Sequence, residues 1–214
     1  MEERKISERE SIEIITSMIA RTRHRLTKGE GNMLLFWGYL CVIVAIATVV
    51  YGYVKYTSGL SLPSIGGYVW WLIPAIGIPY TLIVGHRNSA KREVLTYTDR
   101  LSVALWKYVL WLAFAAFVIG LFFFISGFPV WYVMQLFTFF VVGMAVSVQG
   151  IIIKERSMIW GGAFSVISGG FLVAALLSGV NWLRAYSVEL FVISFIVMMI
   201  IPGHILNHKA KKEQ

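Results

Sequence analysis

The chain has 214 residues, of which 58% are hydrophobic and 14% are charged. Soluble domains carry about 25% charged residues, so this composition excludes an ordinary soluble protein and predicts that the chain lies in a lipid bilayer. The net charge of +8 does not require a nucleic acid, because basic residues beside apolar runs meet lipid headgroups. The single cysteine, Cys41, excludes an internal disulfide and a cysteine-based metal cluster.

Residues 1–31 are predicted to form a cytoplasmic helical arm. They are too charged for a secretory signal, which needs an apolar core of about 7 to 15 residues. Ser7 and Glu10 have the spacing of a capping box, so a helix is expected to begin there. Its apolar side chains fall on one stripe: Ile12, Ile15, Ile19 and Leu26, flanked by Met18. This amphipathic helix can lie on the inner leaflet, pair with another copy or another protein, or pack under the bundle.

Six apolar runs of about the 20 residues needed to cross a bilayer follow the arm. They cover approximately residues 32–54, 68–85, 101–125, 130–153, 158–180 and 188–206. They predict an all-α fold, a polytopic bundle of six transmembrane helices. Residues 207–214 are predicted to be a basic cytoplasmic tail.

The basic residues between these runs are distributed unevenly. Sixteen lie before the first run, after the second, after the fourth or after the last, whereas the intervening loops hold only Lys55 and Arg184. Lysine and arginine in short loops accumulate on the cytoplasmic side. We therefore expect a multi-pass protein of the bacterial inner membrane with both termini in the cytoplasm.

A shift of 123 positions aligns two pairs of short motifs. Trp37-Gly38 falls on Trp160-Gly161, and Pro79 falls on Pro202. The match predicts that spans one and two and spans five and six are parallel copies of one hairpin, with coincidence in apolar sequence as the alternative. A proline inside a helix either bends it or ends it, so Pro79 and Pro202 are candidate hinges or simple helix ends.

Polar side chains inside spans are candidate functional groups because they are costly in lipid. The candidates are Lys107, Gln135, Gln149 and Glu189. Each also has a structural explanation. Lys107 can extend to the interface, Glu189 suits the first turn of a helix, and glutamines form hydrogen bonds between helices.

Catalytic and metal-binding patterns are not recognisable in the sequence. We expect no catalytic residues, no cofactor and no metal, because there is no nucleophile motif with a paired histidine and no phosphate-binding glycine loop. His204 and His208 have the i, i+4 spacing of metal ligands but lack a nearby third ligand.

Small residues at Gly161, Ser165 and Gly169 predict close approach of a second helix.

Three segments carry a resemblance to a known group. These are "ISERESIEIITSMI" near the start, "TYTDRL" at residues 96–101 and "IIPGHIL" at residues 200–206. Together they make the chain similar to uncharacterised six-span bacterial inner-membrane proteins that often accompany winged-helix transcription regulators. The resemblance implies a membrane partner or sensor and no known activity.

The expected function is therefore non-enzymatic. We expect the arm and residues 86–100 to engage a cytosolic or membrane protein, because the richest polar patterning lies outside the spans. The alternative is a small-solute transporter that uses the paired hairpins and their prolines. Faces of small residues also suit a homo-oligomer.

Overall fold

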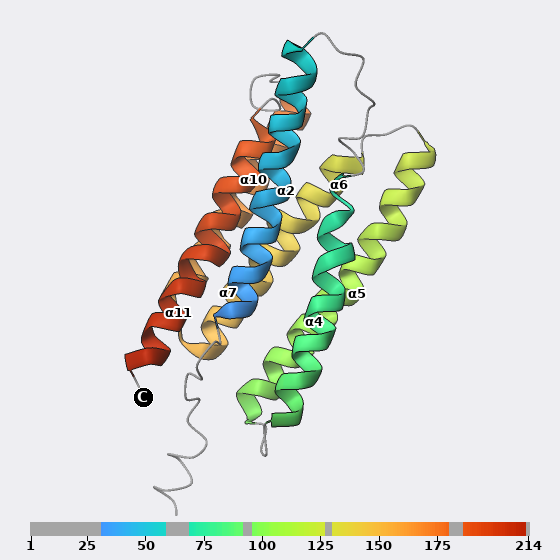
Figure 1. Ribbon diagram of the computed structural model, residues 1–214. Coiled ribbons are helices and arrows are strands. Elements are labelled where there is room, and N and C mark those ends of the chain that lie inside the picture. Colours follow the sequence, from blue (N-terminus) through green and yellow to red (C-terminus); the bar gives the residue numbers. More distant parts are fainter. Residues whose placement is uncertain (1–30, 59–68, 92–95, 127–129, 180–185, 213–214) are drawn as a thin grey trace, which may run out of the picture.

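The computed structural model describes residues 31–58, 69–91, 96–126, 130–179 and 186–212, and these residues are almost entirely helical, with no strand among them. The arm candidates Ile12, Ile15, Met18, Ile19 and Leu26 lie outside the described residues. The elements in chain order are α2 (Asn32–Thr57), α4 (Leu72–Lys91), α5 (Tyr97–Ile125), α6 (Val130–Phe137), η1 (Thr138–Val142), α7 (Gly143–Ile153), α8 (Arg156–Ser178), α10 (Ser187–Phe195), η2 (Ile196–Ile200) and α11 (Ile201–Lys212). Figure 1 shows them as a bundle of long, roughly parallel and antiparallel rods.

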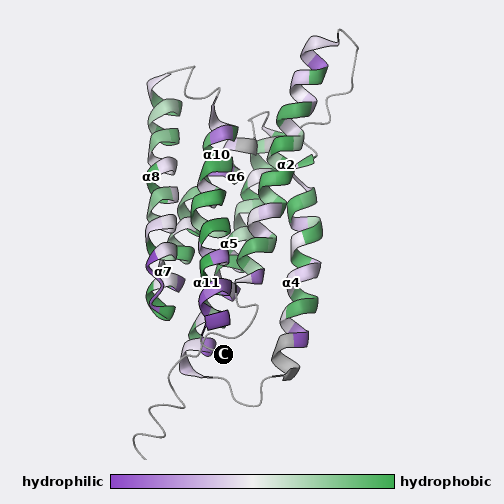
Figure 2. Ribbon diagram, turned by 60° about the vertical axis from the view of Figure 1, so that its left-hand side comes forward, coloured by the Kyte–Doolittle hydropathy of each residue, from purple (hydrophilic) through white to green (hydrophobic). Residues whose placement is uncertain are grey.

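Five helical segments in the described part of the chain are long and apolar enough to cross a membrane. They are Asn32–Thr57, Tyr97–Phe123, Tyr132–Ile153, Arg156–Ser178 and Ser187–Lys212. Figure 2 shows hydrophobic residues along the rods and hydrophilic residues gathered near the end that holds the C-terminus. The predicted all-helical, multi-pass membrane bundle is therefore confirmed in outline.

The second predicted span differs from its expectation. A helix does form there, but α4 begins at Leu72 rather than at residue 68 and is not among the five segments. Its apolar part, residues 72–85, stops at His86 and Arg87. At about 1.5 Å per residue this part is roughly 21 Å long, shorter than a hydrocarbon core of about 30 Å.

Other boundaries also moved. Residues 207–212, in the predicted basic tail, continue α11 as helix to Lys212. Helix α5 begins at Tyr97, four residues before the predicted span, because Asp99 and Thr96 cap its start. The Asp99 carboxylate accepts hydrogen bonds from the backbone N–H (3.1 Å) and hydroxyl (2.8 Å) of Thr96, and the Thr96 hydroxyl accepts one from the Asp99 backbone N–H.

The buried core centres on α8. This helix packs against α6, η1 and α7 and also against α10, η2 and α11, while α2 contacts α10, η2, α11 and α4. Fully buried side chains at these contacts include Phe139, Met158, Leu172, Met198 and Leu206. Helices α4 and α5 lie beside this core (Figure 1).

The ends of the helices define two ends of the bundle. We call one the charged end: α2 begins there, the α7–α8 turn lies there, and α11 finishes there (Figure 1). The charged residues described at the opposite end are Lys55, near the end of α2, and Glu189, at the start of α10.

Candidate functional site

Two spans are interrupted by π-helical turns inside the core. In η1 and η2 the backbone adopts the wider turn, and Ile201 N–H donates to the carbonyl of Ile196, five residues earlier. Phe139 in η1 and Met198 in η2 are completely buried. Single π turns within α-helices occur frequently at functional sites, so the two turns mark the region to inspect.

Pro202 explains why η2 leaves a carbonyl without a helical donor. The α-helical donor for the Val197 carbonyl would be Ile201 N–H, which bonds Ile196 instead. The π-helical donor would be residue 202, and proline has no N–H. The Val197 oxygen is covered by Gly161 of α8, because a Cβ atom on Gly161 would lie only 2.6 Å from that oxygen. A glycine is therefore required where α8 meets η2.

A second glycine packs on the same turn from the other side. A Cβ atom on Gly38 of α2 would lie 2.7 Å from Ile200 Cγ1 and 3.2 Å from Met199 Cβ. The η2 turn is thus held between Gly38 and Gly161, the two glycines that the shift of 123 positions aligns.

The aligned tryptophans and prolines, by contrast, have different surroundings. Trp37 contacts Gly77 of α4, whereas Trp160 is 74% exposed. Pro79 is exposed and Pro202 is buried. Both prolines lie inside continuous helical segments, so neither ends a helix. The aligned positions therefore do not make equivalent contacts in the two hairpins.

The small-residue face of α8 contacts both π turns. Gly161 meets η2, Ser165 Oγ donates to the carbonyl of Phe139 in η1 (3.3 Å), and a Cβ atom on Gly169 would lie 2.8 Å from Phe139 Cβ. Close approach at these positions is what the sequence predicts. The face packs against both interrupted spans, which also contact each other through the rings of Phe139 and Phe191.

Three buried polar atoms have no hydrogen-bond partner among the described residues: Gln135 Oε1, Gln149 Oε1 and Ser194 Oγ. The other ends of the two amides are used. Gln135 Nε2 donates to the Ser187 carbonyl (3.0 Å), and Gln149 Nε2 donates to Ser102 Oγ (3.0 Å). An unsatisfied buried polar group costs about 1–3 kcal/mol, so these atoms are places where a small hydrogen-bonding molecule would be favoured.

The structure does not gather the candidates Pro79, Lys107, Gln135, Gln149, Glu189 and Pro202 into one site. Lys107 and Glu189 are exposed, as is Pro79, while Gln149 is half-buried. Gln135 and Pro202 are both fully buried. However, Gln135 bonds the Ser187 carbonyl at the start of α10, whereas Pro202 is the second residue of α11, on the other side of η2.

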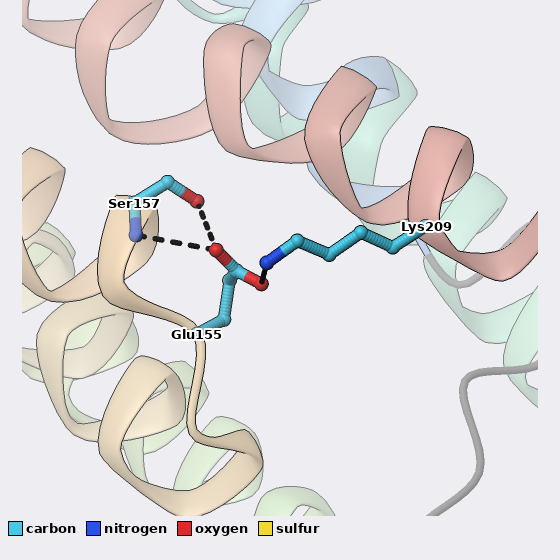
Figure 3. Close-up of polar contacts among 3 residues, drawn as sticks. All are labelled: Glu155, Ser157 and Lys209. Carbon is cyan, nitrogen blue, oxygen red and sulfur yellow. Dashed lines mark hydrogen bonds and ion pairs between the residues drawn. The ribbon is translucent and has the colours of Figure 1, made fainter. Parts of the chain in front are cut away.

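At the charged end, Glu155 joins α8 to α11. It is the N-cap of α8, where its carboxylate accepts hydrogen bonds from Ser157 N (3.3 Å) and Ser157 Oγ (2.9 Å). Its other oxygen is 2.6 Å from Lys209 Nζ of α11, as Figure 3 shows. Burial of this carboxyl raises its pKa, but the hydrogen bonds from Lys209 and Ser157 and the lysine charge outweigh burial and hold the pKa below its usual value.

A second contact at the charged end joins α2 to α11. We call it the α2–α11 junction, formed by Gly31, Asn32, Gly203 and Asn207. Gly31 N donates to Asn207 Oδ1 (3.0 Å), and Asn207 Nδ2 donates to Asn32 Oδ1 (2.7 Å). A Cβ atom on Gly31 would overlap the Gly203 carbonyl. One turn further on, Tyr39 Oη and His204 Nε2 are 2.8 Å apart.

Sequence reasoning missed Glu155, Asn207 and Ser194. Glu155 could have been found, because a lone acidic residue two positions before a serine stood between two long apolar runs. Asn207 and Ser194 gave no such signal, since their importance depends on which helix lies opposite. Among the described residues, no three His, Cys, Asp or Glu side chains are placed to hold a metal, and His204 contacts Tyr39 instead.

Comparisons of the chain with protein-family models, curated proteins and solved structures found no match. The functional argument therefore rests on the contacts above. Two features carry it: the α2–α11 junction beside the Glu155–Lys209 pair, and the core around the two π turns.

Proposed function

We propose that this chain is a non-enzymatic, multi-pass protein of the bacterial inner membrane whose arm, residues 1–31, engages a cytosolic or membrane protein. The observation that carries the proposal is the α2–α11 junction. The backbone N–H of Gly31, where the arm joins the bundle, is held by Asn207. A partner that pulls or rotates the arm would therefore act directly on α11.

The contacts next to the junction favour transmission from the arm into the bundle. Lys209 lies two residues beyond Asn207 and pairs with Glu155 at the start of α8. Gly203, one turn before Asn207, lies directly after the buried Pro202 and close to η2. A displacement at Gly31 would thus reach both α8 and the π turn, which is how a membrane-anchored sensor or docking subunit could respond.

We further propose six spans with both termini on the cytoplasmic side. Helix α4 would be the short sixth span, since it pairs with α2 through Trp37, whose indole N–H donates to Thr81 Oγ1 (3.0 Å). The uneven distribution of basic residues supports placing the charged end in the cytoplasm. Helices shorter than the hydrocarbon core are accommodated by local thinning of the bilayer or by extension of flanking polar side chains.

The partner class follows from the resemblance. The proteins that the three sequence segments resemble often accompany winged-helix regulators, so such a regulator is the first partner to test, with a second copy of this chain as the other. No nucleic-acid contact by this chain is proposed.

The test is capture of partners from native membranes by the detergent-solubilised full chain and by a chain lacking residues 1–28. The control is a full-length variant with Ile12, Ile15 and Ile19 changed to serine, which keeps the arm but removes its apolar stripe. Loss of one protein from both variants supports the proposal. Identical capture by all three chains contradicts it, provided circular dichroism shows an intact helical bundle in each.

A small-solute transporter is the second candidate, and a specific observation favours it. The buried hydroxyl of Ser194 has no partner among the described residues and lies just before η2. Interrupted helices with unsatisfied polar groups are a feature of transporter binding sites. Uptake into proteoliposomes of a panel of small polar solutes, compared with Ser194→Ala, tests it. Uptake no faster than in empty vesicles would contradict this candidate.

A further inference from the structure

The α7–α8 turn presents two cations that have no acidic partner among the described residues. Lys154 and Arg156 flank Glu155 and are both exposed. The carboxylate between them is already used by Ser157 and Lys209. The other acidic residue described at the charged end, Asp99, accepts hydrogen bonds from Thr96 on a different element. The positive charge of the turn is therefore not neutralised by the described part of the chain.

The backbone fixes where these two cations lie. Lys154 has positive φ (60°) and ends α7 in the left-handed conformation, which is unusual for a residue with a side chain. Arg156 is the first residue of α8, directly after its cap. The turn therefore presents one cation from the end of a span and one from the start of the next, at the boundary between apolar helix and polar surface.

An exposed apolar stripe continues from Arg156 along α8. Trp160 (74% exposed), Phe164, Ile167 and Phe171 are all exposed large hydrophobics, and with Arg156 they have the spacing of a single helix face. Tryptophan favours the headgroup layer of a bilayer because its ring is apolar with one polar N–H. Along this face, the two cations are therefore followed by Trp160, which suits the headgroup layer, and then by apolar side chains that suit the hydrocarbon layer.

We propose that the α7–α8 turn and the adjoining face of α8 form a binding site for one anionic glycerophospholipid. The phosphate would lie between the side chains of Lys154 and Arg156, the glycerol region against Trp160, and one acyl chain along Phe164, Ile167 and Phe171. Charge complementarity identifies this occupant, since the ammonium group of a zwitterionic lipid would be a third cation beside two that are not neutralised. The proposed site uses no residue of the arm and requires no protein partner.

The test uses the full chain in nanodiscs of equal parts phosphatidylglycerol and phosphatidylcholine, with retained lipid measured by native mass spectrometry after transfer to detergent. The double variant Lys154→Gln, Arg156→Gln should lower the ratio of retained phosphatidylglycerol to phosphatidylcholine by roughly 25-fold, about fivefold for each charge near an anionic surface. The control, Lys211→Gln with Lys212→Gln, removes two exposed cations from the same end and should leave the ratio nearly unchanged.

A second measurement locates the lipid. Quenching of Trp160, taken as the difference between the native chain and Trp160→Phe, should be stronger with acyl-brominated phosphatidylglycerol than with acyl-brominated phosphatidylcholine at equal mole fraction. An equal fall in the ratio of retained phosphatidylglycerol to phosphatidylcholine in the two double variants would overturn the proposal. Equal quenching by the two lipids would also overturn it. Displacement of phosphatidylglycerol by soluble glycerol phosphate would also overturn it, because the site would then recognise a free phosphate rather than a lipid. Retention of an acidic protein in place of lipid would do the same.

Discussion

Helices α8 and α5 are both strongly apolar, yet they are buried to very different extents. In the most apolar stretch of Arg156–Ser178, 39% of residues are buried, against 11% in Tyr97–Phe123. The difference follows side-chain size. Helix α8 contains glycines and serines that let α7, η1 and η2 approach its backbone, whereas α5 carries exposed large rings at Tyr108, Trp111, Phe114 and Phe122.

The comparison teaches that apolar content places a helix in the membrane without deciding its neighbours. Lipid is as apolar as a leucine side chain, so association of spans depends on close backbone packing and on hydrogen bonds. On that basis, substitutions on the α8 side should act on the whole bundle, and those on the α4 and α5 side should act locally.

The largest effect is expected from Gly162→Ala. A Cβ atom there would overlap the Gly143 carbonyl and Ser147 of α7, so the two helices must separate, at a cost of about 2–3 kcal/mol in the free energy of unfolding. Denaturation in detergent followed by circular dichroism measures it. The matched control is Gly170→Ala on the same helix, where nothing lies within 4 Å. Similar losses in both variants would contradict the packing argument.

The next effect is expected from Glu155→Gln, which removes the charge that joins the α8 cap to Lys209. Hydrogen bonds to charged groups contribute about 1.5–3 kcal/mol, and because Lys209 is half-exposed we expect the lower value. Lys209→Gln should cost a similar amount, and the double variant little more. Fully additive losses in this cycle would mean that the two side chains do not interact.

The same pair predicts a pH dependence. Because the folded protein lowers the pKa of Glu155, the stabilisation is fully present above the value of about 4.3 for an unfolded chain. It is lost as pH falls through the folded pKa. The stability difference between the native chain and Glu155→Gln should therefore be constant near neutral pH and shrink in acid. A difference that does not change on acidification would show that the carboxylate charge is not responsible.

A local effect is expected where α4 joins α2. Trp37→Phe removes the indole N–H that bonds Thr81 (3.0 Å) but keeps an aromatic ring near Gly77. Thr81 retains its own bond to the Gly77 carbonyl (2.8 Å), so the cost should be about 1 kcal/mol. Hydrogen exchange should increase in α4 and remain unchanged in α8. Faster exchange throughout the bundle would show that α4 is as integrated as the core helices.

The smallest effect is expected from Gln135→Leu. The substitution loses the bond to the Ser187 carbonyl but also removes a buried oxygen that has no partner among the described residues. These changes oppose each other, so the free energy of unfolding should change by less than about 1 kcal/mol. If solute uptake is found, a strong loss of uptake in this variant with unchanged stability would assign Gln135 to the solute pathway. A large loss of stability would instead mean that its amide is fully satisfied in the membrane.

Sequence alone determined that the chain is an all-helical, multi-pass membrane protein, and it determined most span positions. The reason is that a helix in lipid needs a long apolar run whichever helices it packs against. Residues 130–153 follow the prediction at both ends, although the η1 turn inside that span has no sequence signal. The bounds of α4 were not predicted, since the helix runs from Leu72 to Lys91 whereas the predicted span covered residues 68–85. The arm stays a prediction, because it lies outside the described residues.

Tertiary structure decided which residues matter inside the bundle. Gly38 and Gly161 were matched by sequence, but their shared neighbour, the η2 turn, became evident only once α2 and α8 were placed on either side of it. The side-chain contacts of α11 likewise exist only because this helix continues past Leu206. Lys209 bonds Glu155, 54 positions away in the chain, and Asn207 bonds Asn32, 175 positions away. Apolar content is a property of single segments, whereas close packing and hydrogen bonding are properties of pairs, and only the folded bundle defines those pairs.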